Sequence, residues 1–138
     1  MGRFEYFEHT ADVGIAACGS DLRDAFGAAG LGLFSLMADL DNVRDDVCVD
    51  VVVEADDIED LLVAWLNELL FVFDVKHLLL RRFDVERLDK RQLRARCCGE
   101  PFDPKRHRLR LGVKAATYHQ VSVEPVDEGC RVRVVVDV

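Results

Sequence analysis

The second half of the chain is built from strand-like segments that short polar turns join in pairs. The segments LLLRRFDVERL and RQLRARCCGE flank a turn at 89–91, and TYHQVSVEPV and CRVRVVVDV flank a turn at 127–129. Short turns between strands produce antiparallel hairpins, since the chain reverses its direction within a few residues. The part of the chain from residue 78 onward therefore predicts a mainly antiparallel sheet.

The first half adds two helices and three further strands. The segments 3–8, 13–18 and 47–53 show strand-like apolar patterns, whereas two longer segments carry apolar side chains at helical spacing. We expect Ser20 to cap the first helix and Asp56 to begin the second. The predicted fold class is α+β, with two helices packed on one side of a mainly antiparallel β-sheet.

Length and composition predict one domain over residues 1–138. Half of the residues are hydrophobic, and no Gly/Ser-rich tract divides the chain. No apolar run approaches the roughly 18 residues that a membrane-spanning helix needs. The N-terminal residues MGRFEYFEH lack the apolar centre of a secretory signal. We therefore expect a cytoplasmic protein that does not bind membranes.

The net charge of −8 is distributed unevenly along the chain. Residues 1–75 hold 17 acidic and 3 basic residues, whereas residues 76–114 hold 13 basic and 5 acidic residues. A basic face is typical of proteins that bind nucleic acid. The alternative interpretation is that these strands only have arginine-rich surfaces.

The five cysteines are expected to be reduced. Cys18, Cys48 and Cys130 lie within apolar strand-like runs, Cys97 and Cys98 are adjacent, and no CxxC pair occurs. Small buried thiols are typical of such positions. We therefore expect neither a disulfide framework nor a zinc site.

The polar residues nearest the two ends form the first candidate site. If the last strand pairs beside the first, Asp12, Asp137 and the α-carboxylate of Val138 converge as hard oxygen ligands. Carboxylates at such distances repel unless a cation or a proton neutralises one of them. The alternative is that Asp137 is a solvated polar residue and that Asp12 closes a turn before Gly14.

The segment 112–120, GVKAATYHQ, is the second candidate. In an extended chain, one face would carry Lys114, Ala116, Tyr118 and Gln120. Beside a carboxylate cluster, Lys114 could bind a phosphate or a partner's carboxylate, and it is otherwise an ordinary surface lysine. His9 and His119 are potential proton carriers or simple hydrogen-bonding residues. No GxSxG, P-loop or HExxH motif occurs, so no standard catalytic set is present.

These blocks together resemble the archease family. The similar blocks are HTADVGIAACGSDLRDAF, DLLVAWLNELLFVFD, GEPFD, GVKAATYHQVSV and VVVDV, which follow one another from residue 4 to residue 138. The combination of HTAD, the WLNELL helix and VKAATYH is specific, although each alone is weak. The chain differs from the family pattern at Ala116, where a larger apolar residue is common, and in its arginine-rich 76–114 region.

The resemblance implies an archease-like sandwich and an accessory role in tRNA splicing or RNA repair, and not a stand-alone enzyme. Archeases promote guanylylation and multiple turnover of the RtcB-type RNA ligase, which uses GTP and manganese. The family's metal site, usually described with calcium, corresponds to Asp12, Asp137 and Val138, and the residue that activates the partner corresponds to Lys114. All-oxygen ligands also suit Mg²⁺ or Mn²⁺. His9, Tyr118 and His119 would be neighbours of this site, and RNA would be contacted indirectly through the ligase.

A second hypothesis assigns the function to the basic stretch. The protein would then be a chaperone-like or RNA-binding modulator of a tRNA modification enzyme, such as a tRNA methyltransferase. Direct RNA contact would involve Arg81, Arg82, Arg94 and Arg96. A metal-dependent hydrolase has the least support, because no set of general bases accompanies the acidic residues.

Overall fold

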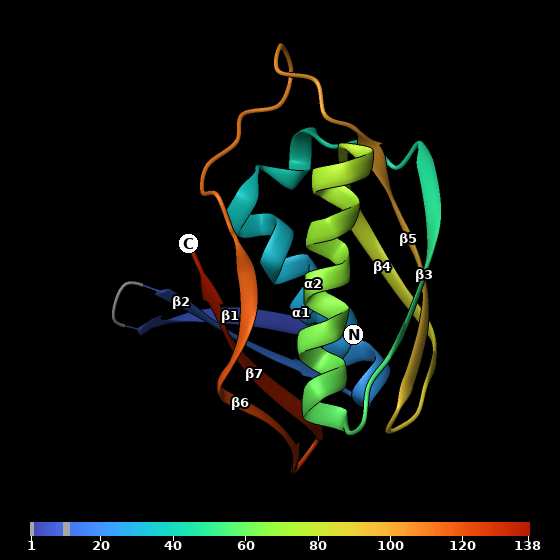
Figure 1. The fold of residues 1–138 in the computed structure, drawn as a ribbon, viewed down its shortest axis with the longest axis vertical. Helices are drawn as coiled ribbons and strands as arrows, with labels where there is room; N and C mark the ends of the chain where they lie inside the picture. The colour runs from blue at the N-terminus through green and yellow to red at the C-terminus, as the bar shows by residue number, and fades with distance from the viewer. Residues whose placement is uncertain (1, 10–11) are drawn as a thin grey trace.

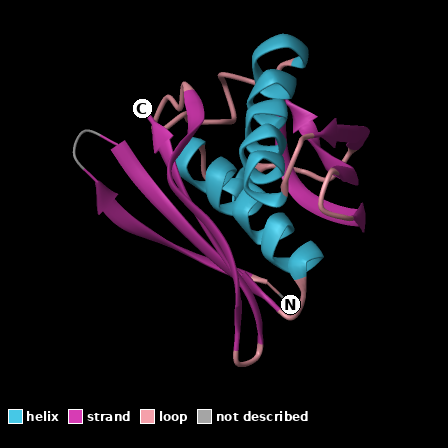
Figure 2. Ribbon diagram, turned by 60° about the horizontal axis from the view of Figure 1, so that its bottom comes forward, coloured by secondary structure: helices cyan, strands magenta, loops and turns pink. Residues whose placement is uncertain are grey.

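Two antiparallel sheets enclose the two helices of the protein. The structure is a computed structural model that describes residues 2–9 and 12–138, except for the side chains of Glu8 and His9. The helices lie between the sheets, as Figures 1 and 2 show, and they contact strands of both. Each sheet therefore has one face covered by helices and one face turned outward.

The four-stranded sheet has the spatial order β1 (Arg3–His9), β2 (Asp12–Gly19), β7 (Gly129–Asp137) and β6 (Ala115–Val126). The three-stranded sheet has the order β3 (Val47–Glu54), β5 (Gln92–Pro101) and β4 (Leu78–Leu88). The helices are α1 (Leu22–Met37), α2 (Ile58–Lys76) and the short 3₁₀-helix η1 (Leu40–Asn42). Every pairing between neighbouring strands is antiparallel.

The predicted α+β class is confirmed, including the two helices and the antiparallel pairing. The sequence did not indicate that the strands divide into two sheets. This division follows from the apolar surface of the helices, because side chains from both helices and both sheets join one hydrophobic cluster. A helix that is apolar around most of its circumference needs cover on more than one side.

The contacts between the helices and their neighbours agree with the apolar spacing in the sequence. Trp65 is fully buried, and its Nε1–H donates to the carbonyl oxygen of Phe26 at 2.9 Å. Gly30 allows α1 to approach β4, since a Cβ there would lie 3.0 Å from Cδ1 of Phe83.

Both predicted helix caps are wrong by one residue. Asp21, not Ser20, caps α1 and accepts a hydrogen bond from the N–H of Asp24. Asp57, not Asp56, caps α2 and accepts from the N–H of Asp60. Neighbouring residues with capping side chains are locally equivalent in sequence, so packing decides which one adopts the extended backbone of a cap.

One expectation about the cysteines is also wrong. Cys48 in β3 lies opposite Cys98 in β5, and their sulfur atoms form a disulfide. Cys18, Cys97 and Cys130 are free, as expected. The two bridged cysteines are 50 positions apart, so only the pairing of β3 with β5 brings them together.

Among the described residues, no helix is long and apolar enough to cross a membrane.

The bulge in β4 leads to a stability prediction. A Cβ on Gly99 would overlap the carbonyl of Leu79, close to the irregularity between Leu80 and Arg82. Because backbone cannot move aside as a flexible side chain can, Gly99→Ala should lower the free energy of unfolding by about 3 kcal/mol.

Urea denaturation measures this difference. Gly112→Ala is the matched control, since a Cβ on Gly112 would meet no described atom within 4 Å. The control should change the free energy of unfolding by less than about 0.5 kcal/mol. Equal effects of the two substitutions would contradict the assigned close approach between β4 and β5.

Candidate metal and partner-binding site

The last strand, β7, pairs with β2 and not, as expected from the sequence, with the first strand, β1. The pairing of β2 with β7 places Asp12 directly opposite Asp137. The same ladder continues through Val13 with Val136 and ends with Gly19 opposite Cys130. Directly opposed residues have Cβ atoms about 4.5–5.5 Å apart, and like charges at such positions destabilise the pairing. The structure therefore concentrates negative charge at one end of this strand pair.

The two aspartates lie on the face of the sheet that is turned away from the helices. Their neighbours Val13 and Val136 pack in or against the hydrophobic core, and successive side chains in a strand alternate between faces. The side chain of Val138 also packs against the core. This contact keeps the end of β7 in place beside the aspartates, both of which are half-buried.

The outer face next to this acidic pair is partly closed by an aromatic ring. Phe7 of β1 lies over Gly14, at a position that any Cβ on Gly14 would occupy. The guanidinium of Arg133 lies over the same ring, 4.2 Å from its centroid. Val135, which pairs with Gly14, is consequently fully buried although its neighbour Val136 faces the core.

Lys114 reaches the same end of the sheet through β6. Its N–H donates to the carbonyl oxygen of Asp137 at 2.7 Å, and the next residue, Ala115, pairs with Asp137 in the ladder. The side chain of Lys114 is exposed. Asp12, Asp137 and Lys114 therefore come from three adjacent strands or their ends, and the structure brings them together.

The predicted alternation along 114–120 is wrong. Ala116 is buried opposite Val136, whereas Lys114, Tyr118 and Gln120 are exposed. The β6–β7 register shifts between Thr117 and Ser122, and Gln120 has a φ of 55°. A bulge of this kind breaks the two-residue period of a strand, so alternation does not place the side chains beyond it.

Three other residues were predicted to lie beside the acidic pair: Tyr118, His119 and His9. Tyr118 is 62% exposed and His119 is also exposed, and both lie in the bulge that follows Lys114 in β6. His9 pairs through its backbone with Asp12, and its side chain lies outside the described residues. Thr10 and Ala11 of the HTAD motif are also outside the described part of the chain.

The chain matches the Archease protein family over residues 4–138. The protein belongs to the archease family. Protein archease of Sulfolobus acidocaldarius is 39% identical over 139 residues, covering 100% of both chains. Protein archease of Thermococcus kodakarensis is 39% identical over 133 residues, covering 94% of this chain and 93% of the relative. The solution structure of Methanobacterium thermoautotrophicum protein 1598 has a TM-score of 0.82, with 34% identity and 98% of each chain covered.

Two polar residues with structural hydrogen bonds, Asn67 and Glu100, had not been identified from the sequence. Asn67 of α2 forms two hydrogen bonds with the backbone of Ala116, at 2.8 and 3.3 Å. The signal was a polar amide within the apolar WLNELL segment. Glu100 lies in the loop-proximal end of β5 and is buried, which is uncommon for a carboxylate without partners.

Glu100 anchors the connection between β5 and β6. It accepts hydrogen bonds from the N–H of Arg44 and from Arg106, and its Oε1 lies 2.7 Å from Nε2 of His107. The N–H of Asp103 donates to Nδ1 of His107 at 2.9 Å, so the ring is the tautomer with its proton on Nε2. These contacts bind the chain segment that leads toward Lys114.

The arginines of the basic stretch are mostly engaged within the protein. Arg82 forms ion pairs with Asp45 and Asp84, and Arg96 pairs with Asp50. Arg81 donates to the carbonyl oxygen of Val43 at 2.7 Å. Acidic side chains thus offset much of the positive charge on the outer face of the three-stranded sheet. Arg94 of β5 pairs through its backbone with Val52 of β3 on one side and with Arg87 of β4 on the other.

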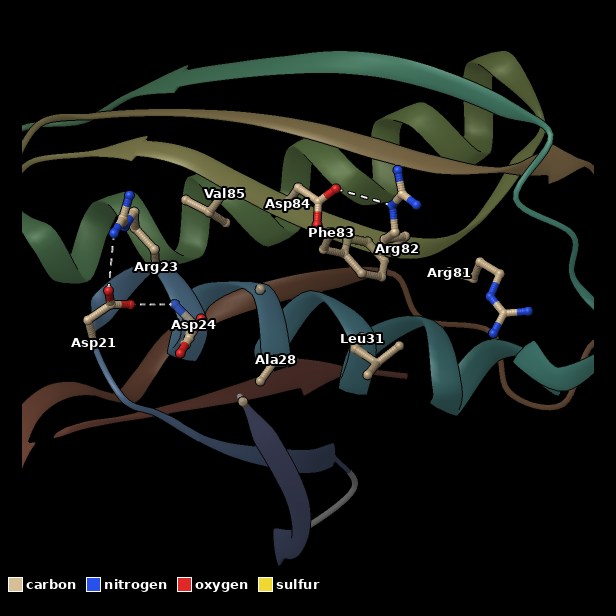
Figure 3. A pocket seen from close by; sticks show the side chains of 12 residues that line it. Asp21, Arg23, Asp24, Ala28, Leu31, Arg81, Arg82, Phe83, Asp84 and Val85 are labelled. Carbon is tan, nitrogen blue, oxygen red and sulfur yellow. Dashed lines mark hydrogen bonds and ion pairs between the residues drawn. The ribbon is translucent and has the colours of Figure 1, made fainter. Parts of the chain in front are cut away.

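Two other features lie apart from the acidic pair. A cavity of about 410 Å³ lies between α1 and β4. Two pairs of its charged residues are ion pairs, Arg23 with Asp21 and Arg82 with Asp84 (Figure 3). The carboxylate of Asp45 lies within 4.8 Å of both sulfurs of the disulfide. Sulfurs bonded to each other are not thiolate ligands, so this cluster is not a metal site in the oxidised protein.

The buried Glu100 predicts a specific dependence of stability on pH. Burial raises the pKa of this carboxyl, but the hydrogen bonds from Arg44, His107 and Arg106 outweigh burial and lower its pKa to about 2. A carboxyl with a lowered pKa stabilises the folded state above its unfolded pKa, and this contribution is lost as pH falls toward the folded value. Stability from Glu100 should therefore decline between about pH 4.5 and pH 2.

Glu100→Gln tests this assignment by thermal and urea unfolding at several pH values. At pH 7 the substitution should lower the free energy of unfolding by about 2 kcal/mol, because hydrogen bonds to a charged group are lost. The difference from the wild type should shrink as pH falls from about 4.5 to 2. A difference that stays constant over this range would contradict the assignment. Glu86→Gln, at an exposed position of β4, is the control.

Proposed function

We propose that this archease is a non-enzymatic activator of an RtcB-type RNA ligase. In this role it promotes guanylylation of the ligase's histidine and multiple turnover during tRNA splicing or RNA repair. The observation that carries the proposal is the junction of three strands at one point. Asp12 faces Asp137 there, and the backbone of Lys114 is bonded to Asp137.

The donor set at this junction fits a hard divalent cation. Asp12 and Asp137 supply carboxylate oxygens, and the terminal carboxylate of Val138 is the third proposed ligand. The free thiols Cys18 and Cys130 belong to the opposite end of the same strand pair, where Gly19 faces Cys130. Oxygen donors without sulfur suit Ca²⁺, with Mg²⁺ or Mn²⁺ as alternatives, and disfavour zinc.

The charges on the chain indicate how the site would act on the ligase. A divalent cation would supply positive charge that counters the facing carboxylates and attracts phosphate oxygens. Lys114, exposed beside the acidic pair, would bind a phosphate or carboxylate of the ligase–GTP complex. We propose that this end of the sheet enters the ligase's nucleotide pocket. Lys114 would there stabilise the phosphate charge that develops as the histidine attacks.

The competing hypothesis of direct RNA binding receives less support. Three of the four arginines that it requires are held by acceptors within the protein, namely Arg81, Arg82 and Arg96. Phosphate binding would compete with these contacts. Tyr118 and His119, exposed beside Lys114, instead extend the proposed ligase-binding surface.

Ligase turnover with RNA, GTP and Mn²⁺ tests the proposed function directly. Wild-type protein should increase the number of ligation events per ligase. Asp12→Ala, Asp137→Ala and Lys114→Ala should each reduce the stimulation at least about tenfold, because removing one partner of a charged contact costs about 2–5 kcal/mol. Circular dichroism should show the folded state retained in each variant.

Matched controls replace the same residue types far from the junction. Asp127→Ala, in the turn before β7, and Lys90→Ala, in the turn between β4 and β5, both alter exposed side chains. Both controls should stimulate the ligase as the wild type does. If wild-type protein has no effect on turnover, or if the site variants behave like the controls, the proposed function is wrong.

Cation binding is tested without the ligase by thermal unfolding in Ca²⁺ and in chelator. A ligand present at 100 times its Kd stabilises the folded state by about 2.7 kcal/mol, which corresponds to several degrees in Tm for a chain of this size. Wild-type protein should show this increase, and Asp137→Asn should abolish it. Asp127→Asn should retain it. An equal increase in Asp137→Asn would place the cation elsewhere.

A variant extended by a few glycines after Val138 tests the third ligand. The extension moves the terminal carboxylate away while leaving both aspartates in place. The increase in Tm with Ca²⁺ should therefore become smaller. An unchanged increase would remove Val138 from the ligand set and leave the two aspartates.

A further inference from the structure

Asn67 of α2 bonds both backbone groups of one residue in β6. Its Oδ1 accepts the N–H of Ala116 at 2.8 Å, and its Nδ2 donates to the carbonyl oxygen of Ala116 at 3.3 Å. A side-chain amide in this arrangement reproduces the hydrogen bonds of a neighbouring strand. β6 is the last strand of its sheet, so a helix provides at Ala116 the partner that an inner strand obtains from its neighbour.

The residue that Asn67 holds lies two positions after Lys114. The segment 111–114 has no helix or strand assignment, and β6 begins at Ala115. Lys114 is bonded to β7 through its N–H, while Ala116 is bonded to α2 on the other side. The backbone around Lys114 is therefore fixed from two directions just where an irregular segment enters the sheet.

The helix that presents Asn67 is itself held firmly. Trp65, Leu66 and Leu69, on the same helix, are fully buried, and the indole of Trp65 bonds to α1. A functional side chain is placed more accurately by a packed helix than by a loop. Thr117, the next residue, still pairs with Val135, and its hydroxyl donates to the carbonyl oxygen of Val135 at 2.9 Å. Beyond Thr117 the ladder with β7 is interrupted, so the contact with α2 lies at the last residue but one before the bulge.

We propose that Asn67 is a positioning residue that acts through the backbone of Ala116 to hold Lys114 beside Asp137. The inference rests on the proposed function, because Lys114 has its role there. Asn67 does not need to touch the ligase. Its amide fixes where the lysine side chain begins and so how it meets the partner.

Amide hydrogen exchange, followed residue by residue by NMR, tests the positioning without the ligase. Asn67→Ala should increase the exchange rate at Ala116 and also at Lys114 by about tenfold, because the segment opens once one anchor is lost. Faster exchange at Ala116 alone would show that Asn67 acts locally, and the proposal would be overturned. Unchanged exchange at both amides would overturn it as well.

Ligase turnover at increasing concentrations of this archease separates positioning from loss of folded protein. A variant that is only less stable has fewer folded molecules, so it needs a higher concentration but reaches the same maximal stimulation. Asn67→Ala should instead lower the maximal stimulation, by about fivefold, since each activator molecule presents Lys114 poorly. Trp65→Phe is the matched control on the same helix, because it loses a buried hydrogen bond that does not involve β6.

Two further substitutions refine the test. Asn67→Asp keeps the acceptor but places a carboxylate beside the carbonyl oxygen of Ala116, so its maximal stimulation should be no higher than that of Asn67→Ala. Asn67→Gln keeps the amide and should restore part of the stimulation. Asn42→Ala, an exposed asparagine in η1, should behave as the wild type.

The outcomes distinguish this inference from the proposed function. Without stimulation by the wild type, the proposed function is wrong, and hydrogen exchange alone decides whether Asn67 holds the Lys114 segment. With stimulation by the wild type, an undiminished maximum in Asn67→Ala would overturn the positioning role while leaving the proposed function intact.

Discussion

The antiparallel pairing of β2 with β7 is the interaction on which the site depends. It brings residue 12 and residue 137 into one row of a ladder, although almost the whole chain lies between them. The interior half of this ladder is apolar, and its burial against the helices sets the register, since a shift by one residue would expose Val132, Val134 and Val136. The acidic pair at its end is therefore maintained by hydrophobic packing, against the mutual repulsion of the carboxylates.

The helices connect this sheet to the rest of the molecule. α2 contacts β6 on one side and the three-stranded sheet on the other, so the position of the edge strand is coupled to the hydrophobic core. Two polar contacts, one buried and one half-buried, hold the start of β6 and the loop before it. Asn67 holds Ala116, and Glu100 with His107 holds the loop that precedes Lys114. Hydrogen bonds therefore hold the segment around the exposed Lys114 at several positions.

The sequence predicted much of this architecture and part of the site. Apolar periodicity identified both helices and the strands. The hypothesis that Asp12 and Asp137 converge agrees with their opposition in the ladder. The sequence predicted the wrong strand face for Tyr118, because a bulge interrupts β6 between Thr117 and Ser122. No residue type in 117–121 indicates such a bulge.

Other features escaped prediction for a related reason. The disulfide between Cys48 and Cys98 and the contact between Asn67 and Ala116 both join residues about 50 positions apart. Each partner has an ordinary local environment in the sequence. Their encounter depends on the register of β3 with β5, or on the distance between a helix and a strand edge. The pattern of residue types along the chain contains neither the register nor the distance.

The amino-acid sequence by itself determined the local order of the chain. It decided where helices and strands form and which side chains are apolar enough to be buried. It also decided which acidic residues lie near the two ends of the chain. These properties follow from neighbours within a few residues, through backbone hydrogen bonding and the periodic placement of side chains. Only the tertiary structure decided that the strands divide into two sheets around the helices. It also decided that the backbone of Lys114 is bonded to Asp137 and that Asn67 is bonded to the backbone of Ala116. Such decisions arise because burial of the apolar surfaces selects one packing, and that packing brings distant polar groups within hydrogen-bonding distance.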